Sequence, residues 1–153
     1  LDLSVRHAER LPNRFHVGVH YVFGDSLTGL IVDGPLPRES RPVQTRWLPI
    51  ACDDDMIVHL LITNQMFSAD SAQETFYTAR IFNASDSEPI VAEFSLLPNA
   101  TFAKPINDLV PEVKEFLGGK IGWLYLTTAP ASFSNVHYAI VYKDRSVAAD
   151  HAF

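Results

Sequence analysis

Apolar residues occupy every second position of the segment from residue 15 to residue 23. They are Phe15, Val17, Val19, Tyr21 and Phe23. The positions between them include His16, Gly18 and His20, so the two sets of side chains would lie on opposite faces of an extended strand. A strand with one apolar face is stable only when that face is buried and its backbone groups pair with neighbouring strands. This alternation therefore predicts a protein built on a β-sheet.

Further strand patterns follow along the rest of the chain. They span residues 27–34, 45–50, 56–63, 76–82, 90–97, 121–128 and 134–144. The segment 56–63 is almost continuously apolar, which is typical of a central strand covered on both faces. The segments 76–82 and 90–97 are joined by a polar turn, so we expect them to form a hairpin with a long loop. In the segment 45–50 we expect Trp47 to be buried.

One helical pattern interrupts the strands, at residues 108–117. Asp108 can cap its start, apolar residues recur at helical spacing, and Gly118 can end it. About eight strands with a single short helix indicate an all-β fold, an antiparallel β-sandwich that is Ig-like or jelly-roll-like, with one short α-helix near 108–117. A parallel sheet would need a helix between most strands, and the spacers are too short for that. We expect residues 1–153 to form a single domain, either alone or as a piece of a longer protein.

Composition narrows the classes of partner and compartment. The chain carries 12 Lys and Arg against 18 Asp and Glu, which argues against a nucleic-acid partner because phosphate binding needs a basic surface. No apolar run approaches the roughly 18 residues of a membrane span. The single cysteine, Cys52, cannot form an internal disulfide, and the N-terminal residues lack the apolar region of a signal peptide. These features slightly favour a cytoplasmic protein over a secreted one.

The segment VFGDSLTG, residues 22–29, permits two interpretations. Glycine, aspartate and serine are typical turn residues, because glycine adopts positive φ and short polar side chains bond to nearby backbone, so they predict a hairpin turn. The string GDSL within the segment also resembles the first block of the GDSL esterases. That resemblance implies a serine hydrolase on a parallel sheet flanked by helices, in which Ser26 is the nucleophile and a base such as His151 takes its proton.

A second resemblance covers residues 82–109. The string FNASDSEPIVAEFSLLPNATFAKPINDL contains a strand ending in Asn, an acidic turn, a second strand and then Asn-Asp-Leu. In this arrangement it is similar to the small bacterial sandwich proteins typified by the sensory rhodopsin transducer. The resemblance implies a binding or signalling module rather than an enzyme, and it transfers no functional residue to this chain.

Six histidines raise the question of a metal site. His16 and His20 share one face of a strand, but four residues of strand separate them by about 13 Å, which is too far to bind one ion together. His137 and His151, near the C-terminal end of the sequence, could meet either of them across strands. We expect no metal and no cofactor, and we keep His16, His20 and His137 as candidate ligand-binding residues. A small-molecule or metal-binding β-barrel is the corresponding alternative.

Trp123 and Tyr125 have the same parity in the segment 121–128, so both lie on one face of that strand. Leu124 and Leu126 on the opposite face are also apolar, so the face of Trp123 and Tyr125 is either a partner surface or part of a second core. Exposed aromatic side chains contribute strongly to recognition surfaces. We expect a non-catalytic binding or assembly module for a protein or a carbohydrate, with Trp123 and Tyr125 as candidate binding residues and a homo-oligomer as one form of assembly. The serine hydrolase and the β-barrel stay open as alternatives.

Overall fold

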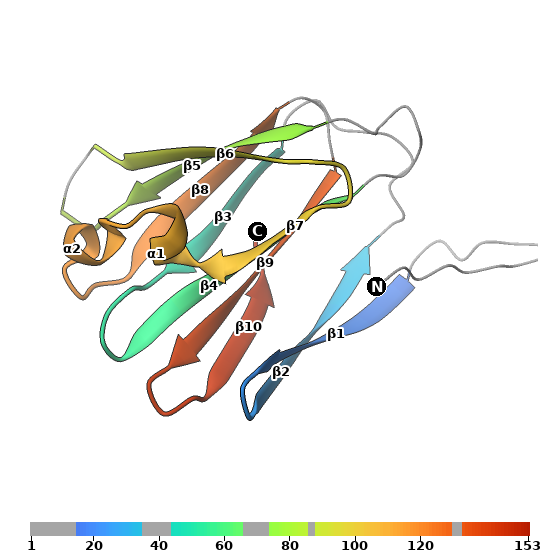
Figure 1. Cartoon of the computed structure of the whole chain (residues 1–153), viewed down its shortest axis with the longest axis horizontal. Coiled ribbons are helices and arrows are strands. Elements are labelled where there is room, and N and C mark those ends of the chain that lie inside the picture. Colours follow the sequence, from blue (N-terminus) through green and yellow to red (C-terminus); the bar gives the residue numbers. More distant parts are fainter. Residues whose placement is uncertain (1–14, 35–43, 66–73, 86–87, 130–132) are drawn as a thin grey trace, which may run out of the picture.

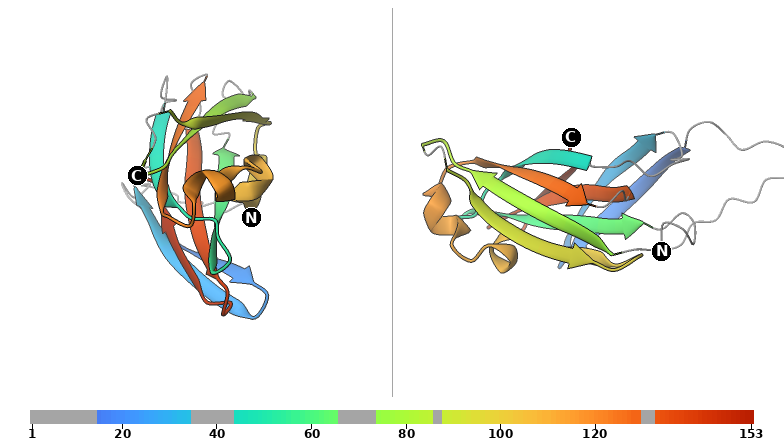
Figure 2. Two further views of the ribbon diagram at one scale, coloured as in Figure 1. Left: turned by 90° about the vertical axis from the view of Figure 1, so that its left-hand side faces the viewer. Right: turned by 90° about the horizontal axis from the view of Figure 1, so that it is seen from above.

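A computed structural model describes residues 15–34, 44–65, 74–85, 88–129 and 133–153. Two four-stranded antiparallel sheets pack face to face, and a two-stranded hairpin lies beside one of them (Figure 1). The elements are β1 (Phe15–Phe23), β2 (Ser26–Gly34), β3 (Gln44–Ile50), β4 (Met56–Gln65), β5 (Thr75–Phe82), β6 (Ile90–Leu96), β7 (Thr101–Pro105), α1 (Ile106–Leu109), α2 (Val113–Leu117), β8 (Gly122–Ala129), β9 (Phe133–Tyr142) and β10 (Val147–His151). The expected antiparallel β-sandwich is confirmed, and Figure 2 shows it from two further directions.

The strand order explains how segments far apart in the sequence come together. The first sheet has the order β3-β8-β5-β6, and the second sheet has the order β10-β9-β4-β7. All of these neighbours pair antiparallel. The almost continuously apolar strand β4 is central in its sheet, as expected, and β5 and β6 form the expected hairpin.

The core lies between the inner faces of the two sheets. The buried inward-facing side chains of two central strands are Tyr77, Ala79 and Ile81 of β5 and Val58, Leu60 and Ile62 of β4. Full burial of a large apolar side chain contributes about 1.5–3 kcal/mol, so these alternating positions supply much of the driving force for folding. The Tyr77 hydroxyl also lies 2.6 Å from the Ser134 hydroxyl of β9, and this hydrogen bond joins the two sheets in the interior.

The expected single helix over 108–117 is wrong, because α1 and α2 are two separate short helices. Pro111 lies between them. Proline lacks an N–H and disfavours helical geometry in the residue before it, and Val110 is accordingly extended, with φ −133° and ψ 91°. Asp108 lies in the first turn of α1 and is not its cap, whereas Gly118 ends α2 in the left-handed conformation, as expected. Neither helix is long enough to cross a membrane, and the described residues contain no other that could.

Two strands of the sandwich, β7 and β10, lie outside the eight expected strands. The segment of β7 is only five residues long and contains a lysine and a proline, so it lacks an alternating pattern. The segment of β10 is equally short, and its small residues Ala148 and Ala149 give little hydrophobic signal. Each strand is held by its neighbour, β7 by β4 and β10 by β9, rather than by its own composition.

The chain also connects the two sheets at their edges. After β10, the Ala152 N–H donates to the Val136 carbonyl of β9, and Phe153 then exchanges two backbone hydrogen bonds with Trp47 of β3, at 2.9 and 3.0 Å. The final residues therefore cover the edge of β3. At the opposite edge, β6 leads into β7 through a turn closed by the bond from the Ala100 N–H to the Leu97 carbonyl.

Candidate recognition surface

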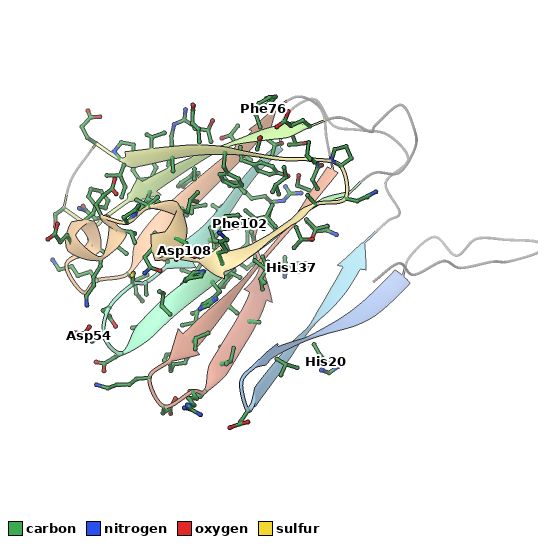
Figure 3. The ribbon with its side chains drawn as sticks, in the orientation of Figure 1. His20, Asp54, Phe76, Phe102, Asp108 and His137 are labelled. Atoms are coloured by element: carbon green, nitrogen blue, oxygen red, sulfur yellow. The ribbon has the colours of Figure 1, made fainter. Side chains whose placement is uncertain are left out.

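The outer face of the first sheet carries large aromatic side chains that remain partly exposed. Trp123 and Tyr125 of β8 are 45% and 44% exposed. Trp47 of β3 is 40% exposed on the same side, so the expectation that it is buried is wrong. Figure 3 shows Phe76 on the outer side of β5. We call this surface the aromatic face, and its aromatic residues are Trp47, Phe76, Phe82, Trp123, Tyr125 and Phe153.

Strand register places a tryptophan, a tyrosine and an arginine next to one another on this face. Trp47 of β3 is paired with Tyr125 of β8, and Tyr125 is paired with Arg80 of β5. The row continues to Val91 of β6, which is also exposed. Trp, Tyr and Arg are the residues most enriched among those that contribute most to the free energy of protein binding. One row across the sheet therefore combines all three.

The neighbouring row is polar and contains no aromatic residue. It consists of Thr45, Thr127, Thr78 and Glu93, one from each strand of the sheet. Aromatic side chains beside polar ones resemble the arrangement of a protein interface, in which a desolvated centre is bordered by polar residues.

The aromatic rings contact one another rather than standing apart. The ring centroids of Trp47 and Trp123 are 5.4 Å apart with planes at 62°, an edge-to-face contact. Trp47 also stacks on Phe153, at 4.9 Å and 29°, and Phe82 meets Tyr125 edge to face at 5.6 Å. Such contacts fix the orientation of the rings and contribute about 0.5–1.5 kcal/mol each beyond their burial. The aromatic face is therefore a pre-ordered surface.

Two opposite charges lie within this face. Arg80 and Glu93 are both exposed and occupy diagonal positions, because Arg80 pairs with Val91 and Glu93 pairs with Thr78. Within the described part of the chain, neither side chain has an ion-pair partner. Glu74, which accepts a hydrogen bond from Ser95 at the end of the sheet, adds a second negative charge. The described part of the face thus has a formal charge of −1, on a chain whose formal net charge is −6.

The expected histidine candidates do not gather at one point. His137 of β9 and His151 of β10 are directly opposite in register, whereas His20 is exposed on the separate β1–β2 hairpin (Figure 3). The side chain of His16 lies outside the described residues. Burial lowers the pKa of His137 below its usual value, and the nearby His151 lowers it further, whereas Asp150 raises it. Among the described residues, no group of three or more His, Cys, Asp or Glu is placed to hold a metal ion.

The GDSL segment forms a two-residue hairpin turn between β1 and β2. Gly24 adopts a φ of 58°, and Phe23 pairs with Ser26 across the turn. Asp25 of this turn makes an ion pair with Arg145, at 3.8 Å, which lies just before β10. His151 ends β10, at the opposite end of that strand from Arg145, and the side chain of Ser26 lies outside the described residues. Labelling of Ser26 by a fluorophosphonate is the test of the hydrolase alternative.

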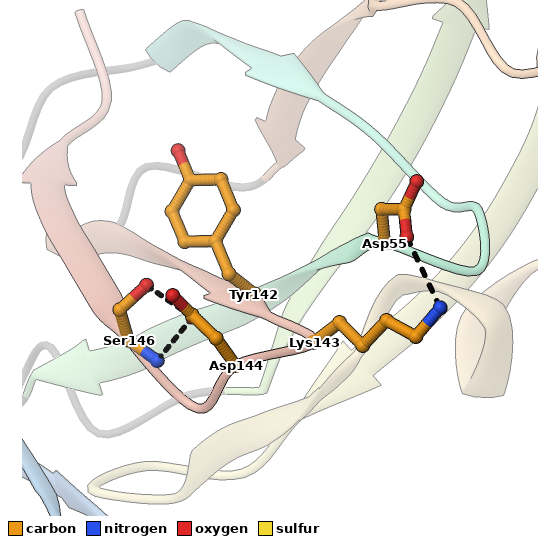
Figure 4. Close-up of a pocket in the computed structure, with 5 residues that line it drawn as sticks. All are labelled: Asp55, Tyr142, Lys143, Asp144 and Ser146. Carbon is orange, nitrogen blue, oxygen red and sulfur yellow. Dashed lines mark hydrogen bonds and ion pairs between the residues drawn. The ribbon is translucent and has the colours of Figure 1, made fainter.

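A shallow depression lies at the other end of β9 (Figure 4). It is lined by Asp55, Tyr142, Lys143, Asp144 and Ser146. Its charged groups are already engaged with one another, since Lys143 pairs with Asp55 at 3.4 Å and Asp144 accepts two hydrogen bonds from Ser146. These hydrogen bonds lower the pKa of Asp144. The depression offers no convergent set of unpaired groups comparable to the aromatic face.

Comparisons with protein-family models, with curated proteins and with solved structures give no match for this chain.

The sequence interpretation identified Trp123 and Tyr125 but missed Trp47, Arg80 and Phe153. Trp47 and Arg80 could be assigned to the same surface only once the register of β3, β8 and β5 was known. Phe153 joins the face through the backbone pairing of the final residues with β3, for which the sequence carries no local signal.

Proposed function

We propose that this chain is a non-catalytic recognition module that binds a protein partner through the aromatic face. The observation that carries the proposal is the exposed row of Trp47, Tyr125 and Arg80, side by side on three neighbouring strands. Exposed aromatic residues in this number are costly to leave in water, and covering them with a partner removes that cost.

Ring packing favours a protein over a carbohydrate. A sugar ring stacks on an aromatic ring whose face is free, whereas Trp47 already has Phe153 stacked against it and Trp123 at its edge. A protein surface can instead pack against these unevenly oriented rings, because its apolar side chains can fit into the spaces between the rings. Burial of Arg80 beside Tyr125 adds a directional polar contact to this apolar centre.

A photo-crosslinking amino acid in place of Thr78 tests the proposal, because Thr78 is central on the aromatic face. The modified chain is illuminated in an extract of the cells from which the sequence derives. We expect one protein to be captured, and we expect Tyr125→Glu to abolish the capture by placing a charge at the centre of the contact.

The matched control is Ala103→Glu, which introduces the same charge at an exposed position of β7 in the second sheet. It should leave the capture unchanged. Capture that is equally sensitive to both variants, or no capture, contradicts the proposal. A saturable change in tryptophan fluorescence on titration with neutral oligosaccharides, lost in Trp123→Ala, would also contradict it and would identify the face as a carbohydrate site.

A further inference from the structure

We infer that the protein bound by the aromatic face is a second copy of this chain, docked face to face about a twofold axis. This inference rests on the proposed function. It concerns the identity of the partner, which the exposed aromatic residues alone do not specify.

The charges on the face are self-complementary. In a twofold interface every contact occurs twice, so Arg80 of one copy can face Glu93 of the other while Glu93 faces the second Arg80. The two residues are diagonal neighbours on β5 and β6, about 7–8 Å apart along the sheet. A twofold axis passing midway between them, in the plane of the interface, brings both pairs into register.

The overall charge of the chain also favours this face for self-association. Two copies with a formal net charge of −6 each repel one another, and the repulsion is smallest where the approaching surfaces are nearly neutral. Among the described residues, the aromatic face carries Arg80 and Glu93 near its centre and Glu74 at the end of β5, where its carboxylate accepts a hydrogen bond from Ser95. In a dimer Arg80 and Glu93 each meet an opposite charge, so neither of these two is buried unpaired.

The area of the face is small for a specific interface between two proteins. Strands of seven residues at about 3.3 Å per residue, in a four-stranded sheet with a strand spacing of about 4.8 Å, give a flat area of roughly 440 Å² per copy. Two copies then bury about 900 Å² in total, and the protruding aromatic side chains add to this flat area. The smallest specific interfaces bury about 1,000–1,200 Å². We therefore expect a weak, reversible dimer that forms at micromolar or higher concentrations.

Sedimentation velocity from about 1 to about 300 µM tests the inference on the full chain. We expect a shift from monomer to dimer over this range. Arg80→Glu and Glu93→Arg should each weaken association at least tenfold, because each places two like charges opposite one another. The double variant with both substitutions should restore association, because it exchanges the charges and keeps every pair opposite.

The control Ala103→Glu should associate like the unmodified chain. Dimers that persist in both single variants, or a double variant as weak as the single ones, overturn the inference. A chain that stays monomeric but captures a different protein at position 78, dependent on Tyr125, overturns the self-association and leaves the proposed function intact. A chain that stays monomeric and captures no protein contradicts both the self-association and the proposed function.

Discussion

Replacing Asn64 with alanine should lower the free energy of unfolding by about 3–4 kcal/mol. Asn64 is buried in β4, next to the turn between β6 and β7. Its side-chain amide donates to the carbonyl oxygens of Leu96 and Leu97, at 2.9 and 3.2 Å, and its Oδ1 accepts from the Thr75 hydroxyl at 3.1 Å. Alanine removes these three bonds, at about 1 kcal/mol each. The space left by the amide adds up to about 1 kcal/mol.

Urea unfolding followed by circular dichroism measures this loss. With a slope of about 2 kcal/mol per molar urea, the midpoint should fall by about 1.5–2 M. The loss is a large share of the roughly 5–15 kcal/mol by which such domains are stable. Because β6 contributes one edge of the aromatic face, the same variant should also weaken any binding at that edge.

Two further variants isolate the cause. Asn83→Ala removes one partly buried bond to the Phe116 carbonyl and one exposed bond that Asn83 accepts from the Ser85 N–H, so it should cost only about 1–2 kcal/mol. Thr75→Val removes the bond between Thr75 and Asn64 from the other side, so Asn64→Ala and Thr75→Val together should cost about 1 kcal/mol less than the sum of the two single losses. A loss below about 1 kcal/mol for Asn64→Ala, or strict additivity with Thr75→Val, would refute the reasoning.

Three other expectations concern stability. Tyr77→Phe removes the buried hydrogen bond to Ser134 and should cost about 1–2 kcal/mol in urea unfolding, whereas no loss would mean that the two sheets do not depend on it. Gly118→Ala should lower the free energy of unfolding by about 1 kcal/mol, because φ is 58° there and alanine is strained at positive φ. The added methyl group meets open space, so backbone strain is the only cost. An unchanged melting temperature would contradict this conformation. Burial and the nearby His151 lower the pKa of His137 in the folded state, so the unfolded state binds protons more readily. The free energy of unfolding should therefore be greatest above about pH 6.5 and fall as the pH drops below that value. His137→Gln should reduce this pH dependence, and an unchanged pH profile would exclude the contribution of His137.

Much of the fold follows from alternation. In β5, Tyr77, Ala79 and Ile81 alternate with Thr78 and Arg80, and the structure buries the first set while the second set faces outward. Short elements were less predictable, since β10 depends on pairing with β9 and the helical pattern over 108–117 ignored the break at Pro111. β10 has little local signal and forms through pairing with a strand, whereas at 108–117 the ring of proline interrupts an apolar pattern of helical spacing.

The candidate site was predictable only in part, because parity gives the side of a strand and not what covers that side. Both parities of β8 are apolar, so Trp123 and Tyr125 fitted either a core or a surface until the packing of the sheets was known. Trp47 was assigned to the interior on its size alone. Arg80 joins the site through register with Tyr125, and register depends on contacts between residues distant in sequence.

Hydroxyl-radical footprinting, read by mass spectrometry, tests most directly whether the aromatic face is the surface that meets a partner. Reactivity is compared between the free chain and the bound chain, whether the partner is a second copy at high concentration or the protein captured at position 78. We expect Trp123 and Tyr125 to lose reactivity on binding, while Tyr142, exposed on the second sheet, keeps it. Unchanged reactivity of Trp123 and Tyr125 in the bound state, or protection of Tyr142 instead, would contradict the account.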